Sequence, residues 1–344
     1  MKKRLHTMGD KKIDVTYFQR KPRNGFNFSV EHIFDDVRER LKHKINASVR
    51  YARFYNNGVL SKFGNSLLAA FSQGKGVNHI TGEVHFLDIF MKKSTVILTI
   101  LDCGYMHRKT GISKWLTRLI YLDLPVSRSK YITAISSETK NEVIRYTGCS
   151  AGKIHIIPVA VDELYTPQSK PFNKPNPVIL QIGTGPNKNL QRLAQSLNGI
   201  DCILHIVGRL SDDQKKTLEQ NRIAYKNFYN LSQAEMLQQY INCDIVSFIS
   251  TFEGFGMPIV EANCVERAVI TSNISSMPEV AGDAACLVDP YNTGDIRNGI
   301  MKLVNDDAYR DQLIANGRKN RLRFEAQRIA EQYYALYKKI AARE

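Results

Sequence analysis

The sequence predicts a two-domain α/β protein in which each domain is a doubly wound parallel sheet. Short apolar, β-branched segments alternate with amphipathic segments along the chain, and a proline-rich stretch divides this alternation into two runs. The length of 344 residues allows two domains of ordinary size, each with its own core.

The first run predicts an N-terminal domain over residues 1–160. Its strands are short runs rich in Val, Ile and aromatic residues, and its helices carry apolar residues three and four positions apart. We expect strands at 12–18, 45–54, 94–101, 129–136 and 153–161, and helices at 29–44, 57–74, 111–128 and 136–148.

A linker is predicted at residues 161–176, because the stretch from Pro158 to Pro177 holds five prolines and little apolar periodicity. The second domain, residues 177–325, repeats the alternation. Its strands are expected at 177–184, 202–208, 224–228, 244–250, 268–273 and 285–290, and its helices at 188–199, 211–221, 232–243 and 258–266. The chain is helical from residue 294, and the last helix, 326–344, is expected to return to the N-terminal domain.

Hydropathy and cysteine usage predict a cytoplasmic protein. No apolar run reaches the ~18 to 20 residues that cross a bilayer, and the basic N-terminus lacks the apolar core of a signal peptide. The six cysteines form no CxxC pair, and His107 near Cys103 is a lone partner that completes no zinc site. We therefore expect free thiols and no bound metal.

The excess of positive over negative charge is confined to the first half of the chain. Residues 1–160 carry 27 Lys and Arg against 12 Asp and Glu, whereas residues 161–344 carry 21 of each kind. Such a field suits phospholipid headgroups, nucleic acid or an acidic substrate, and a solvated basic surface is the alternative. The segment around Trp115 and Leu119 joins an apolar stripe to flanking cations, which suits a bilayer surface and equally suits packing on the sheet.

The most informative stretch is STFEGFGMPIVEANC, residues 250–264. A buried strand precedes it and a helix follows, so Glu253 and Glu261 flank a glycine turn at the carboxyl end of a strand. The helix start suits a phosphate, glycine allows close approach of the backbone, and carboxylates accept hydrogen bonds from vicinal hydroxyls. These features together predict a nucleotide-sugar site.

These residues carry a resemblance to a known family. The E-x7-E pattern in EGFGMPIVE, together with SNISSMPEVAGDAACLVDP, ILQIGTGPNKNL and LHIVGR, resembles the donor domain of glycosyltransferase family 4, over most of residues 153–292. The resemblance implies the GT-B fold, two Rossmann-like domains with a deep interdomain cleft. It also implies retaining transfer of a hexosyl group, of mannosyl type, in cell-surface glycan synthesis. The donor would be a GDP- or UDP-linked sugar used without metal, and the acceptor lipid-linked or a polysaccharide.

The resemblance assigns roles to donor-side residues. Glu253 matches the acid that holds the donor sugar, Glu261 the acid that binds ribose, and Lys188 the lysine that neutralises the diphosphate. An arginine that often accompanies this lysine is missing, and Arg209 is the nearest replacement. The implied donor-binding set is Thr184, Lys188, Arg209, Glu253, Phe255, Gly256, Met257 and Glu261.

The acceptor side matches the family less closely. Leu101 stands where the family has a histidine, so Asp102 and His85 are the candidate catalytic residues, with a structural role as the alternative for His85. His85 is assigned to a strand region, TGEVHFL. A loop at the cleft is expected at Arg23, Asn24, Gly25 and Phe26.

The expected partners are the nucleotide sugar, the acceptor and an anionic membrane, which places the protein peripherally at the inner face of the plasma membrane. Two other classes stay open. One is a catalytically silent GT-B subunit, suggested by Leu101 and the missing arginine. The other is a nucleic-acid-binding protein, suggested by a pI near 9.5 but unsupported by any RNP-like, zinc or helix-turn-helix pattern, so no nucleic-acid partner is predicted.

Overall fold

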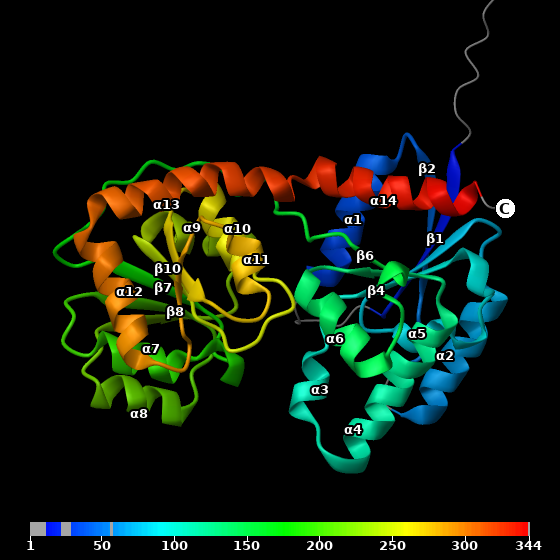
Figure 1. Ribbon diagram of the computed structural model, residues 1–344, viewed down its shortest axis with the longest axis horizontal. Coiled ribbons are helices and arrows are strands. Elements are labelled where there is room, and N and C mark those ends of the chain that lie inside the picture. The colour runs from blue at the N-terminus through cyan, green and yellow to red at the C-terminus, as the bar shows by residue number, and fades with distance from the viewer. Residues whose placement is uncertain (1–11, 22–28, 56–57, 343–344) are drawn as a thin grey trace, which may run out of the picture. The chain divides into compact units, whose positions relative to one another are not determined.

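The computed structural model describes residues 12–21, 29–55 and 58–342, which fall into two compact units (Figure 1). Unit 1 comprises the described residues up to Ala134, then Lys140–Ile157, and the C-terminal residues from Gln327. Unit 2 comprises Ile135–Thr139 and Pro158–Ala326. Unit 1 therefore joins the two ends of the described chain, and each unit contains more than one segment.

Unit 1 is built on a parallel sheet with the strand order β2-β1-β3-β4-β5-β6. Its strands are β1 (Ile13–Gln19), β2 (Ile45–Tyr51), β3 (Val77–Thr81), β4 (Val96–Ile100), β5 (Tyr131–Ala134) and β6 (Ile154–Ile156). Its helices are α1 (Ser29–Leu41), α2 (Val59–Phe71), α3 (Gly104–Arg108), α4 (Gly111–Arg118), α5 (Leu124–Arg128), α6 (Ser137–Thr147), which begins in unit 2, and α14 (Ala326–Ala341). A π-helical segment, Leu119–Asp123, joins α4 to α5.

The central strand β3 was not among the predicted strands, because it carries buried polar side chains instead of an apolar run. Asn78 and His79 are fully buried in it. His79 Nε2 lies 2.7 Å from Thr99 Oγ1, and its Nδ1 lies 2.8 Å from the hydroxyl of Tyr337. The strand region expected around His85 is wrong: His85 begins a 3₁₀ helix, His85–Phe90, after β3 has ended.

Helix α14 belongs to unit 1 by its packing. Tyr333 and Tyr337 are buried, and the hydroxyl of Tyr337 lies 3.1 Å from that of Tyr17 on β1. Lys44 Nζ donates to Glu331 at 2.6 Å. The end of the chain thus completes the core of the N-terminal unit.

Unit 2 contains a second parallel sheet with the order β12-β11-β10-β7-β8-β9. Its strands are β7 (Val178–Ile182), β8 (Ile203–Val207), β9 (Tyr225–Phe228), β10 (Ile245–Phe248), β11 (Ala268–Ser272) and β12 (Cys286–Val288). Its helices are α7 (Leu190–Leu197), α8 (Asp212–Gln220), α9 (Gln233–Asn242), α10 (Met257–Cys264), α11 (Met277–Ala281), α12 (Thr293–Asn305) and α13 (Asp307–Asn320). The predicted strands and helices of this half are confirmed, except that α11 was not predicted.

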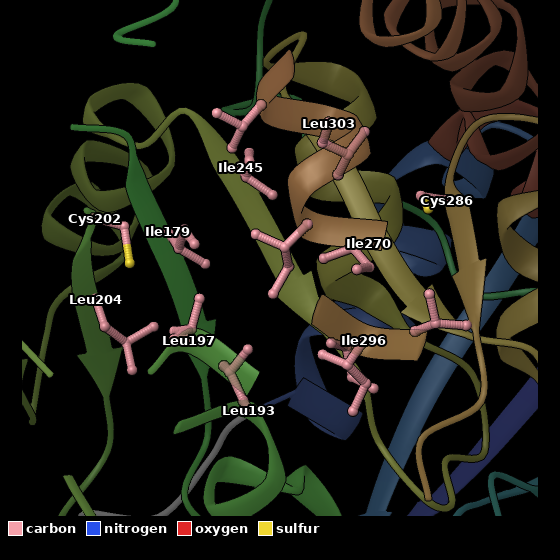
Figure 2. Close-up of a cluster of buried hydrophobic side chains, with 14 of the residues drawn as sticks. Ile179, Leu193, Leu197, Cys202, Leu204, Ile245, Ile270, Cys286, Ile296 and Leu303 are labelled. Atoms are coloured by element: carbon pink, nitrogen blue, oxygen red, sulfur yellow. The ribbon is translucent and has the colours of Figure 1, made fainter. Parts of the chain in front are cut away.

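The core of unit 2 lies between the sheet and the helices α7 and α12 (Figure 2). Leu193 and Leu197 on α7 meet Ile179 on β7, and Ile296 on α12 meets Ile270 on β11 in the same buried cluster. On this side of the sheet, strands and helices that are distant in the sequence are thus held together by one apolar layer.

Residues 161–176, the predicted linker, pack on unit 2. Lys170 forms an ion pair with the buried Asp244, and the guanidinium of Arg310 lies 3.8 Å from the ring centre of Phe172. Among the described residues, no helix is both long and apolar enough to span a bilayer.

Candidate functional site

The candidate donor site lies where the strand order of the unit 2 sheet reverses. In chain order its strands run 3-2-1-4-5-6, so the sequence-first strand β7 and the fourth strand β10 are neighbours and their following loops leave in opposite directions. Ligands of open α/β sheets bind at this switch point, beyond the carboxyl ends of the strands. The loop after β7 carries Lys188, and the loop after β10 carries Glu253.

Lys188 and Glu253 form an ion pair. Lys188 Nζ lies 2.6 Å from Glu253 Oε1, and the two side chains are 22% and 17% exposed. Asn187 Nδ2 donates to the same carboxylate oxygen and to the carbonyl of Phe252, both at 3.0 Å. Lys188, assigned to the diphosphate, and Glu253, assigned to the donor sugar, are therefore in direct contact. Asn187 orients the carboxylate.

Glycine at position 183 makes room for the lysine. Gly183 has φ of 87°, and a Cβ placed there would lie 2.9 Å from Lys188 Cε. Gly208, after β8, has φ of 138°, and its Cβ would lie 2.9 Å from Thr184. These positions need glycine because both the backbone conformation and the close contact exclude a side chain.

Thr184 and Arg209 are neighbours. The Thr184 hydroxyl donates to the carbonyl of Arg209 at 2.7 Å. The guanidinium of Arg209 is exposed and lies 5.5 Å from the ring centre of Tyr229. Thr184 therefore ties the loop after β7 to that after β8, while the arginine side chain lies against an aromatic ring.

Hydroxyl groups hold the shape of the glycine turn. Ser276 lies within hydrogen-bond distance of the carbonyls of Glu253 (2.9 Å) and Phe255 (2.5 Å), and Ser136 donates to the carbonyl of Gly254 at 2.7 Å. The ring of Phe255 is buried edge-on against Phe324 at 5.5 Å. The turn is thus fixed from the side of its carbonyl groups.

The turn leads directly into α10. Gly256 has φ of 125°, and a Cβ there would lie 3.1 Å from Ile259 Cδ1. Helix α10 begins at Met257, one residue before the predicted start at Pro258. Phe255 and Gly256, of the predicted donor-binding set, directly precede the helix, and Met257 is its first residue.

Glu261 lies one turn into α10 with a tyrosine on one of its oxygens. The Tyr240 hydroxyl of α9 donates to Glu261 Oε2, and Tyr165 packs edge-on against Tyr240 at 5.4 Å. Burial raises the pKa of Glu261 to about 7, against the opposing effect of the tyrosine hydrogen bond.

Sequence reasoning missed Asn187, Tyr240 and Ser276. Asn187 adjoins Lys188 and Ser276 precedes the MPEVAG run, so both lay inside quoted motifs without an assigned role. Tyr240 gave no signal, because a tyrosine in an amphipathic helix is typical of a core residue.

In unit 1, Asp102 and His85 lie close enough to interact. Burial lowers the pKa of His85, and the opposing influences are a hydrogen bond to the carbonyl of Tyr121 at 2.8 Å and the charge of Asp102. Asp102 Oδ1 accepts from the amide of Gly104 at 2.7 Å. His85 is 2% exposed, which is the environment of a structural histidine, so its catalytic role stays a prediction.

The predicted loop Arg23, Asn24, Gly25 and Phe26 lies outside the described residues. Within the ranges that the structure describes, no three His, Cys, Asp or Glu side chains are grouped to hold a metal ion.

The architecture is that of GT-B glycosyltransferases. The structure of Anabaena Alr3699/HepE in complex with UDP and glucose superposes with a TM-score of 0.72 at 16% identity, over 94% of this chain and 99% of that one. Residues 165–320 match the family model "Glycosyl transferases group 1". The fold is therefore that of GT-B proteins, and most of unit 2 is similar to the group 1 glycosyl transferases.

The chain is also similar in sequence to bacterial mannosyltransferases. The chain is 25% identical to the O-antigen chain mannosyltransferase B of Escherichia coli over 264 residues, which cover 70% of this chain and 68% of that protein. It is 26% identical to the serotype-specific mannosyltransferase WbdA of Escherichia coli over 55% of this chain but only 26% of WbdA. The chain thus spans about a quarter of the length of the longer relative.

Proposed function

We propose that this protein is a retaining glycosyltransferase of family 4 that transfers a mannosyl-type hexose from a GDP- or UDP-linked donor. The acceptor is lipid-linked or a polysaccharide, as in cell-surface glycan synthesis. One observation carries the proposal: a lysine and a carboxylate are paired at the switch point of the unit 2 sheet, inside the segment that matches the glycosyltransferase model. The names of the mannosyltransferase relatives support the choice of sugar.

The donor opens the Lys188–Glu253 pair. The ammonium group turns to the diphosphate, where a fixed cation stabilises the charge that grows on the departing phosphate oxygen. Glu253 turns to the hydroxyls of the sugar and stabilises the oxocarbenium-like centre. Because each group neutralises the other before binding, neither stays unpaired in the free protein.

Glu261 holds the nucleoside. Its Oε2 accepts from Tyr240, which leaves Oε1 to accept from a ribose hydroxyl. Tyr240 therefore orients the carboxylate without contacting the donor itself.

The transfer proceeds on one face of the sugar. The bond from the anomeric carbon to the phosphate oxygen breaks as the bond to the acceptor oxygen forms on the same side. The acceptor proton passes to the leaving phosphate oxygen, and the nucleoside diphosphate departs. The protein contributes position and electrostatics, with Asp102 proposed on the acceptor side.

The diphosphate site works without a metal ion, because Lys188 and the start of α10 supply positive charge. Transfer is expected to persist in EDTA and to be unchanged by added Mg²⁺ or Mn²⁺. Abolition by EDTA with rescue by Mn²⁺ would show that the diphosphate is held differently.

The enzyme is proposed to act in the cytoplasm, peripherally associated with the inner face of the plasma membrane.

A screen of nucleotide sugars by thermal shift tests the function first, since a ligand of the folded state raises its apparent stability. GDP-mannose or a UDP-hexose is expected to raise the melting temperature of the wild type but not of Lys188→Met. NMR of the product anomer with a glycan-lipid acceptor then tests retention. Donor binding without transfer or donor hydrolysis would identify a catalytically silent GT-B subunit instead.

A further inference from the structure

Exposed apolar side chains are concentrated on unit 1. Among the described residues, 15 of the large hydrophobic side chains that are exposed lie in unit 1 and five in unit 2. Scattered exposed apolar residues are ordinary, whereas a contiguous group marks an interaction surface. Most of the unit 1 group lies on two helices, α2 and α4, both at one end of this unit (Figure 1).

Helix α2 turns an apolar stripe outward. Leu60, Phe63, Leu67 and Phe71 follow each other at spacings of three and four, so they share one face of the helix. Leu60 is 87% and Phe71 is 83% exposed. The opposite face packs inward through Ser66, whose hydroxyl donates to the carbonyl of Phe86 at 2.7 Å.

Helix α4 does the same with Ile112, Trp115 and Leu116, of which Ile112 is 78% and Trp115 is 60% exposed. The sequence allowed the apolar side chains of this helix either to face a bilayer or to pack on the sheet. Packing on the sheet is wrong for these three side chains, whereas Leu119, which follows α4, is half-buried.

Side chains connect α2 with the segments that lie next to α4 in the fold. Lys62 of α2 lies with Nζ 6.0 Å from the ring centre of Tyr121, in the π-helical segment that continues α4. Phe63 packs edge-on against Phe90, at 5.4 Å between ring centres. We call the outward side chains Leu60, Phe63, Leu67, Phe71, Phe90, Ile112, Trp115 and Leu116 the α2–α4 face.

The charge around this face is mainly positive, although Arg118 is paired with Asp123 of the π-helical segment. Helices α2 and α4 carry Lys62, Lys114 and Arg118 and no acidic residue. Lys92 and Lys93, beside Phe90, are exposed as well. Two copies of such a face would bring like charges together, whereas an anionic phospholipid surface complements both its apolar stripe and its cations.

We infer that the α2–α4 face is the surface by which the protein docks on an anionic phospholipid bilayer, with Leu60, Phe71 and Trp115 entering the interface. This inference rests on the membrane association in the proposed function and assigns it to particular side chains. Tryptophan is well suited to the boundary between headgroups and acyl chains, because its ring is apolar with one polar edge.

Sedimentation with liposomes tests the inference on the full chain. The vesicles are phosphatidylcholine alone or mixed with phosphatidylglycerol, each at low and high salt. The wild type is expected to bind the mixed vesicles, weakly the neutral ones, and to keep a salt-resistant part of the binding. Leu60→Ser combined with Phe71→Ser is expected to remove that part and to lower the partition coefficient at least about tenfold, since two buried side chains exceed the 1.4 kcal/mol that corresponds to tenfold.

Two further variants complete the test. Lys62→Gln with Lys114→Gln is expected to remove the salt-sensitive part of binding. Leu164→Ser with Leu322→Ser, at exposed positions of unit 2, is the matched control and is expected to bind as the wild type does. Wild-type binding by the Leu60/Phe71 variant, or no vesicle binding by the wild type, would overturn the inference. The inference would also be overturned if the wild type formed a dimer and this variant were a monomer, because the face would then bind a second copy of the chain.

The nucleotide-induced thermal shift is measured in the same samples. A variant that loses vesicles but keeps the shift supports the docking surface independently of the enzymatic proposal. A wild type that binds vesicles but no nucleotide would instead count against the proposed function alone.

Discussion

Lys188 is held by the carboxylate of Glu253, which the donor displaces in the proposed function. The ion pair with Glu253 and the hydrogen bond from Asn187 fix the acid in the free protein, so each charge is neutralised before a ligand arrives. In the proposed function the donor opens this pair, and the two groups then stabilise the charges that develop on the diphosphate and on the sugar. The same residues are therefore the ones whose substitution separates binding from turnover.

Glu253→Gln is expected to lower turnover about 100-fold, because the carboxylate is proposed to face a centre whose charge changes during transfer. Glu261→Gln is expected to weaken donor binding by about 1.5 to 3 kcal/mol with little change in kcat, since it holds ribose equally before and during reaction. Steady-state kinetics measures both. Glu266→Gln, which removes a carboxylate paired with Arg318 on the same unit, is the control. Indistinguishable kinetic profiles for the two acids would rule out separate roles.

Donor affinity is expected to depend on the protonation of Glu261, whose pKa burial raises from 4.5 to about 7. Ribose hydroxyls donate to the charged form, so binding below about pH 7 requires loss of a proton and weakens as the pH falls. Nucleotide affinity measured at about pH 5 to 8, a range on both sides of this pKa, tests the expectation. Glu261→Gln isolates the effect from the titration of the phosphates, and an unchanged pH profile in that variant would contradict it.

The same shift acts on stability with the opposite sense. Because the folded state holds this proton more tightly than the unfolded state, the contribution of Glu261 to the free energy of unfolding falls as the pH rises from 4.5 to about 7. Nucleotide binding and folding thus place opposite demands on one carboxyl group.

At the scale of elements, the site depends on how tightly the loop after β7 passes over the sheet. Gly183 allows both a left-handed backbone and the contact with Lys188, and Asn189, with φ of 59°, ends the loop and begins α7. The lysine is thus positioned by backbone conformation as well as by its ion pair.

Gly183→Ala is expected to displace Lys188 and to weaken donor binding at least about tenfold. It is also expected to lower the free energy of unfolding by roughly 1–2 kcal/mol, because a residue with a side chain is strained in a left-handed backbone conformation. Gly199→Ala is the matched control, because Gly199 has φ of 71° but no atom within 4 Å of the new Cβ. It is expected to lose stability and keep donor affinity. Calorimetric titration with chemical denaturation separates the two effects, and equal losses of affinity would show that strain alone explains them.

At the scale of the whole molecule, α14 carries the chain from unit 2 back into the core of unit 1. The buried network of Tyr17, His79, Thr99 and Tyr337 depends on this return, and burial lowers the pKa of His79 to about 3, so its ring stays neutral. The N-terminal unit is therefore incomplete until the last helix has been made.

Tyr337→Ala is expected to destabilise unit 1 by about 3 to 5 kcal/mol, the usual cost of removing a buried aromatic ring, and to leave nucleotide binding by unit 2 intact. Hydrogen exchange of peptides from the two units measures the local effect. Tyr334→Ala, half-buried on the same helix, is the control with a smaller loss. Equal loss of protection in both units would contradict this assignment of α14.

The sequence by itself determined the class of fold and most of unit 2. Buried parallel strands such as β7 and β10 are continuous apolar runs, and glycine and proline mark the turns beside them, so local pattern and tertiary structure agree. The acids of EGFGMPIVE were noticeable because they follow the end of a predicted strand, whereas Lys188 was assigned only through the resemblance to the family.

Only the tertiary structure decided what depends on distant partners. Strand β3 has polar residues that are buried because Thr99 and Tyr337 satisfy them, and no local pattern contains those partners. Tyr240 reaches Glu261 across 21 positions of sequence. The stripe of α2 has the period of an ordinary packed helix, and which side of that helix meets the core is settled only when the chain has folded.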